Sequence, residues 1–175
     1  MEETEALINR ILEDHKVIKQ GVRNLEEVAN DIGAMAGLDD IKGDFVPGRF
    51  DQKQSLERLQ DTLEKITRGL EAHFASEETG LLAAFEKHGD SEIAAGLRSL
   101  FLEHEDLRGR LTHAREHVTQ LISGGLASHL WEASAHDMRA HLSHTRKLIE
   151  AHAEAEQELF HTLKKNRGKP EGKGR

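Results

Sequence analysis

The chain has 175 residues, no cysteine, 12 histidines and a formal charge of −8. The missing thiols exclude disulfides, thiolate ligands and cysteine nucleophiles, so any metal must be held by nitrogen and oxygen, and the acidic balance argues against nucleic-acid binding. No apolar run approaches the roughly 20 residues that span a bilayer, and the acidic N-terminus does not look like a secretory signal, so we expect one soluble, cytoplasmic domain without a membrane partner.

Two amphipathic helices are predicted in the first half of the chain. The first begins with Thr4 as its N-cap and ends near Asn30, and the second extends from about Asp51 to Lys87. Residues 33–50 between them are rich in Gly and Asp and contain a proline, which favours a connection longer than is usual in a helical bundle.

Two more helices are predicted after the turn at Gly89. The third is capped by Asp90 or Ser91 and ends near residue 123, and the fourth covers about residues 128–164. Short second and third connections make consecutive helices antiparallel neighbours. The predicted fold class is therefore all-α, an up-down-up-down four-helix bundle over residues 1–165, followed by a disordered basic tail at 166–175.

Four histidines and two glutamates lie on the apolar faces of these helices at nearly the same depth. Each helix contributes one histidine, and two helices carry a glutamate one turn later: His15, His73, Glu77, His104, His152 and Glu156. At about 1.5 Å per residue, the four histidine levels agree within roughly 5 Å. Buried imidazoles and carboxylates are costly unless something satisfies them, so six in one layer indicate a metal site.

The other histidines form weaker patterns. His113 and His117 have the i, i+4 spacing of a metal pair, but they lie opposite His104 on their helix, so we expect a solvated face. His141 is in phase with His152 but about 16 Å away along the axis, which is too far to bind the same ions. We expect surface or flanking positions for the rest: His129, His136, His144 and His161.

The order His, His-x-x-x-Glu, His, His-x-x-x-Glu resembles the hemerythrin-like, or HHE cation-binding, family. The local strings agree as well: Asp14-His15, His73-Phe74-x-x-Glu77-Glu78, His104-Glu105-Asp106-Leu107-Arg108, and His152-x-x-x-Glu156 before Leu159-Phe160. The likeness covers about residues 8–163 without the 33–50 connection. It implies a hemerythrin-like bundle with two non-haem iron ions joined by an oxo or hydroxo bridge, with zinc or manganese as substitutes.

Carried over by position, the resemblance implies that one iron is bound by His15 and His73 and the other by His104 and His152, with Glu77 and Glu156 as bridges. Two departures separate the chain from oxygen carriers. Arg108 stands one turn from the third-helix histidine, where those carriers have a second histidine, and Gln157 stands where they have a final aspartate. Each iron would then keep an open position.

The expected function is binding or sensing of O2, iron, or a related diatomic or peroxide. One alternative is a di-iron enzyme that consumes peroxide or nitric oxide or oxidises ferrous iron, and another is a metal-free helical interaction module. Ligand imidazoles need acceptors for their second nitrogen, and the candidates, which otherwise serve as surface charge, are Asp14, Glu78, Glu103 and Glu105. The sequence identifies no protein partner.

Overall fold

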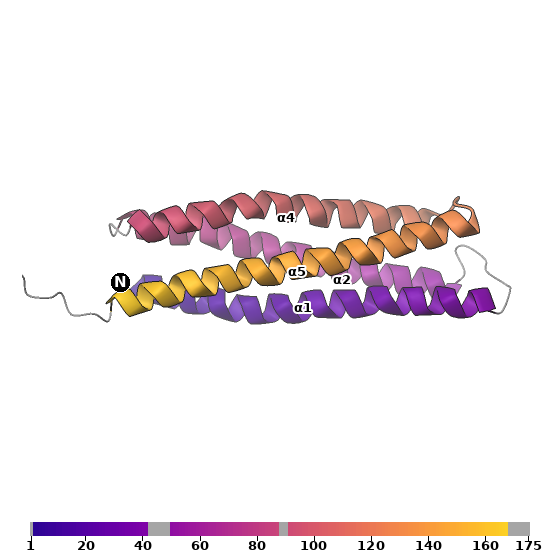
Figure 1. Ribbon diagram of the computed structural model, residues 1–175, viewed down its shortest axis with the longest axis horizontal. Helices are drawn as coiled ribbons and strands as arrows, with labels where there is room; N and C mark the ends of the chain where they lie inside the picture. Colours follow the sequence, from indigo (N-terminus) through magenta and orange to yellow (C-terminus); the bar gives the residue numbers. More distant parts are fainter. Residues whose placement is uncertain (1, 42–49, 88–90, 168–175) are drawn as a thin grey trace, which may run out of the picture.

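Four long antiparallel helical rods form the molecule (Figure 1). The computed structural model describes residues 2–41, 50–87 and 91–167, and this part of the chain contains no strand. Its elements are α1 (Glu2–Ile41), α2 (Phe50–Ser76), the π-helical turn η1 (Glu77–Leu81), α3 (Leu82–Lys87), α4 (Ser91–Ser123) and α5 (Ser128–Arg167). Because α2, η1 and α3 follow one another without a break, they form one rod. The predicted all-α bundle is confirmed.

Each long rod packs against two neighbours. α1 contacts α2 and α5, and α4 contacts the same two helices. The turn from α4 to α5 contains Gly124 at φ 73° and Gly125 at φ 86°, a left-handed conformation that glycine adopts without a Cβ penalty. None of the described helices is long and apolar enough to cross a membrane.

Helix boundaries differ from the prediction mainly at the first connection. α1 continues to Ile41 instead of ending near Asn30, and α2 begins at Phe50, so part of the expected 33–50 connection is helical. The segment Ala34-Met35-Ala36 consists of strong helix formers, which outweigh the single glycines on either side of it. α5 continues to Arg167, so the first two residues of the predicted 166–175 tail are helical. Residues 42–49, with the remainder of the connection, residues 88–90, with the predicted turn at Gly89 and cap at Asp90, and residues 168–175 lie outside the described residues.

The apolar core consists of two clusters, one on each side of the histidine and glutamate layer. The larger cluster reaches the layer with Leu70, Phe74 and Leu107. The smaller one approaches from the opposite side with Ile11 and Leu97. The polar layer is therefore enclosed by apolar side chains along the bundle axis, which excludes bulk water and strengthens electrostatic interactions within the layer.

The π-helical turn shifts the register of the second rod at the layer itself. Core positions up to that point alternate by three and four residues, at Leu56, Leu59, Leu63, Ile66, Leu70, His73 and Glu77. Continuing that alternation would place Gly80 and Ala84 in the core, but the buried residues are Leu81 and Phe85. The Leu82 N–H donates to the Glu77 carbonyl, five residues back, so the turn holds one extra residue. The sequence analysis missed this turn.

Replacement of Phe85 tests the register that follows the π-helical turn. The ring is fully buried in the smaller cluster, so Phe85→Ala should lower the free energy of unfolding by about 3–5 kcal/mol, measured by urea denaturation. Leu102→Ala is the control, because Leu102 is 79% exposed and its loss should change stability little. Equal effects of the two substitutions would contradict the register.

Candidate metal centre

All six residues singled out from the sequence meet in one buried layer. α1 provides His15, α2 provides His73 at its last turn, η1 begins with Glu77, α4 provides His104, and α5 provides His152 and Glu156. None of the six is more than 4% exposed. The amphipathic pattern of each helix explains this placement, since each side chain continues its helix's apolar stripe into the bundle axis.

The six side chains form two groups that share both glutamates. One group contains His15 and His73, the other contains His104 and His152, and Glu77 and Glu156 belong to both. Within each group, one potential ligand atom per residue lies within 4.8 Å of all the others. Each group could therefore hold one cation.

Each carboxylate directs one oxygen to each group. Glu77 places Oε1 2.7 Å from His73 Nε2 and Oε2 3.1 Å from His104 Nε2. Glu156 places Oε2 2.8 Å from His15 Nε2 and Oε1 3.3 Å from His152 Nε2. A carboxylate with its two oxygens turned toward different pairs of imidazoles has the geometry of a bridge between two cations.

The layer contains more buried acceptors than the protein satisfies with hydrogen bonds. Both oxygens of Glu77 and Oε1 of Glu156 are buried and close to imidazole nitrogens, but none of the three accepts a well-aligned hydrogen bond in the described part of the chain. Orphaned carboxylate oxygens in an apolar core are strongly destabilising unless a cation accompanies them. The donor set, four imidazole nitrogens with carboxylate oxygens and no sulfur, fits iron and also zinc or manganese.

Opposite charges in the layer shift the pKa values of its members. Burial alone would raise the pKa of Glu77, but the contacts with His104, His15 and His73 hold it well below its usual range. Burial alone would lower the pKa of His152, but the carboxylates of Glu156 and Glu103 raise it to about 9. Because this pKa lies above 7, a cation that binds the His152 ring must displace a proton.

Three of the four histidines have a carboxylate at the outward-facing ring nitrogen. Nδ1 of His104 lies 2.8 Å from Glu78, and Nδ1 of His152 lies 2.8 Å from Glu103. A carboxylate that accepts a hydrogen bond from the Nδ1–H group fixes the proton on Nδ1 and leaves the lone pair on Nε2, the nitrogen that faces the centre. In the third such contact, Nδ1 of His73 lies 3.4 Å from an Asp14 carboxylate oxygen.

Glu105 and His15 do not follow this pattern of a carboxylate bonded to Nδ1. Glu105 makes no such contact with a histidine among the described residues and lies 3.8 Å from Arg108. Nδ1 of His15 has no hydrogen-bond partner in the described part of the chain. His15 is therefore the least constrained of the four imidazoles, and the two groups have unequal surroundings.

Arg108 supports the centre from outside without entering it. The guanidinium lies 5.3 Å from the Phe74 ring centroid and donates to Glu71 and Glu78. Phe74 in turn stacks on the His104 ring, with centroids 3.9 Å apart. Arg108 therefore orients the carboxylate and the aromatic ring that hold His104, at the position where oxygen carriers have a further histidine.

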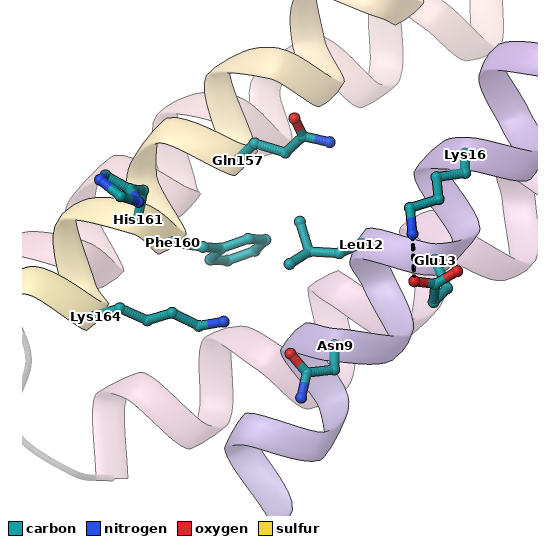
Figure 2. A pocket seen from close by; sticks show the side chains of 8 residues that line it. All are labelled: Asn9, Leu12, Glu13, Lys16, Gln157, Phe160, His161 and Lys164. Carbon is teal, nitrogen blue, oxygen red and sulfur yellow. Dashed lines mark hydrogen bonds and ion pairs between the residues drawn. The ribbon is translucent and has the colours of Figure 1, made fainter.

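A cleft lies between α1 and α5, and the sequence analysis missed it. It has a volume of about 440 Å³ and is lined by Asn9, Leu12, Glu13, Lys16, Gln157, Phe160, His161 and Lys164. Figure 2 shows Leu12 and Phe160 pointing toward each other across the gap between the two helices. Leu12 is three residues from His15 and Phe160 is four from Glu156, so this apolar floor lies one helical turn from the centre.

The raised histidine pKa values predict how metal-stripped protein responds to pH. Protons on His152 stabilise the fold fully below its unfolded value of 6.5, and this stabilisation is lost as pH rises through about 9. The midpoint of thermal unfolding in chelator should therefore fall between pH 6.5 and pH 9, and His152→Gln should flatten this decline. Metal-loaded protein should not show the decline, because metal replaces the protons. Equal slopes with and without metal would contradict this assignment.

Comparison with protein families gives a match to the hemerythrin HHE cation binding domain over residues 6–163. Neither the curated proteins nor the solved structures yield a match. The match covers nearly the whole described bundle and both pairs of candidate ligands. The chain therefore belongs to the hemerythrin HHE cation-binding family.

Proposed function

We propose that this protein holds two non-haem iron ions and binds O2 or a related diatomic at them, as a binding or sensing protein. The observation that carries the proposal is the pair of shared carboxylates, since Glu77 and Glu156 each direct one oxygen to each histidine pair. Family membership supports a metal-binding role, and the lack of sulfur ligands supports a metal that accepts imidazole and carboxylate together.

The protein would supply four ligand atoms to each ion. Each histidine pair gives two nitrogens, and each bridging glutamate gives one oxygen. Iron commonly takes up to six ligands, so positions remain for solvent and for a small molecule. Ferrous iron in such a site would supply the electrons with which O2 or nitric oxide is bound, and the protein's own part is to hold the nitrogens and oxygens in place.

The surroundings of the centre favour small, weakly polar ligands. Apolar clusters close the layer along the bundle axis, and the cleft between α1 and α5 ends at Leu12 and Phe160, one helical turn short of the layer. A diatomic can pass between such side chains after a small rotamer change, whereas a larger polar substrate would have to desolvate. The rim residues Lys16 and Glu13 form an ion pair with each other, 2.6 Å apart.

Binding of nitric oxide to the iron-loaded protein tests the function. Tag-free protein reconstituted with ferrous iron without air should change its visible absorption on titration and reach saturation, without sustained consumption of O2 or peroxide. His73→Ala should lose iron and the absorption change together, whereas His144→Ala, at an exposed position of α5, should keep both. Steady turnover would favour an enzyme. Less than about one iron per chain would favour a metal-free module.

The cleft predicts a kinetic effect that leaves equilibrium binding intact. Leu12→Phe should fill the gap opposite Phe160 and slow nitric oxide association severalfold in stopped-flow experiments, with little change in iron content. Val17→Phe adds a ring to the same helix at a position that is 74% exposed, and should leave the rate unchanged. Identical rates in both variants would exclude this cleft as the access route.

A further inference from the structure

A second group of histidines lies between α4 and α5, away from the candidate metal centre. His113 and His117 are one turn apart on α4, with ring centroids separated by 5.9 Å. The His141 ring of α5 meets His113 edge to face, with centroids 4.9 Å apart. The expectation of a solvated face holds for His113, but it is wrong for His117, which is half-buried and bonded to α5.

Asp137 adds a carboxylate to the same surface. It precedes His141 by one turn on α5, so that α4 and α5 each carry an i, i+4 pair of potential ligands. The two helices pack against each other along the bundle, and the charge of Asp137 acts on His117. Two such pairs on helices that pack against each other place four potential ligands along one stretch of the α4 and α5 surface, and side-chain rotation would have to bring their ligand atoms together.

We propose that His113, His117 and His141 bind a divalent cation of the Zn²⁺ type, with Asp137 or water as the fourth ligand. Two histidines at i and i+4 on one helical face are a recurrent zinc-binding spacing, and a third nitrogen from a neighbouring helix completes a tetrahedral base. Copper and nickel ions share this preference for imidazole, so they belong to the same ligand class.

The hydrogen bond made by His141 prepares that ring for a metal. Its Nε2 lies 3.0 Å from the backbone carbonyl oxygen of Arg110. A carbonyl can only accept, so Nε2 carries the proton and the lone pair is on Nδ1. Fixing the tautomer of a ligand histidine through its other nitrogen is the usual outer-sphere arrangement at zinc sites.

His117 and His113 need only local changes to complete the site. His117 Nε2 lies 2.7 Å from the Ser134 hydroxyl. If Nδ1 binds the metal, this hydrogen bond orients the ring, and if Nε2 binds the metal, the metal replaces the hydroxyl. Burial, followed by the nearby His113 and His141, lowers the pKa of His117, although Asp137 opposes the shift. These surroundings favour the neutral ring, which is the form that binds metal. His113 is exposed, so its rotamer is free to close on the others.

This site is independent of the proposed di-iron function. His141 is eleven residues from His152, which is about 16 Å along α5. The site at His113, His117 and His141 would therefore hold its cation whether or not the buried layer contains iron. A bound cation would join α4 to α5 and stabilise their packing, because a ligand that binds only the folded state raises the unfolding midpoint.

Zinc titration of tag-free, iron-loaded protein by calorimetry tests the proposal. Wild-type protein should bind one more Zn²⁺ than His113→Ala or His141→Ala, or bind that ion at least about tenfold more tightly. The matched control is His136→Ala. His136 is exposed and precedes Asp137, but its ring contacts Arg139 and not the other three histidines. Any zinc taken up at the buried layer is common to all four proteins and cancels in the comparison.

The unfolding midpoint gives a second readout. Zinc should raise the unfolding midpoint of wild type and His136→Ala, and this rise should disappear in His113→Ala. Because His113 is exposed, its replacement should not disturb the fold, so misfolding would not explain the loss. Equal zinc binding by wild type and His113→Ala would overturn the proposal. An equal loss in His136→Ala would do the same, because it would mean nonspecific binding by surface histidines.

Discussion

Two buried carboxylates that the protein leaves without enough hydrogen-bond donors are the constraint on which the rest of this structure depends. Glu77 and Glu156 are fully buried, and three of their four oxygens accept no well-aligned hydrogen bond among the described residues, although imidazole nitrogens lie close to them. Such groups are retained in a core only when positive charge accompanies them. Four helices each bring one imidazole to these oxygens, and the two cations that we propose, joined by the shared carboxylates, would satisfy the inward-facing atoms.

Apolar side chains, outward carboxylates and Arg108 support that layer. Apolar clusters close it along the bundle axis, and outward carboxylates fix three imidazoles with Nε2 turned inward. Arg108 secures one of these carboxylates, so this side chain positions a ligand histidine from outside the centre. Nδ1 of His15 lacks such a partner in the described chain, and His15 is one helical turn from Leu12 at the cleft floor. The cleft and the least constrained imidazole therefore lie on the same side of the bundle.

The sequence was sufficient for the fold class and for bringing the six central residues together, because apolar periodicity fixes both the face and the depth of each side chain. It was insufficient where tertiary contacts decide. The π-helical turn at Glu77 left only a faint signal, the change from small Gly80 and Ala84 to large Leu81 and Phe85 at the buried positions. The cleft and the His113 group depend on which side chains face each other across two helices, which no single-helix pattern specifies. The ligand role of the six residues is a proposal that rests on their geometry.

Family membership places the chain among cation-binding bundles, and the shared carboxylates indicate how two cations would be joined. Mössbauer spectroscopy of protein reconstituted with ⁵⁷Fe and oxidised in air measures that joining directly. We expect two iron ions per chain whose ferric spins are antiferromagnetically coupled through the bridges, giving a diamagnetic ground state. One iron per chain, or two that behave as isolated paramagnetic ions, would contradict the bridged centre.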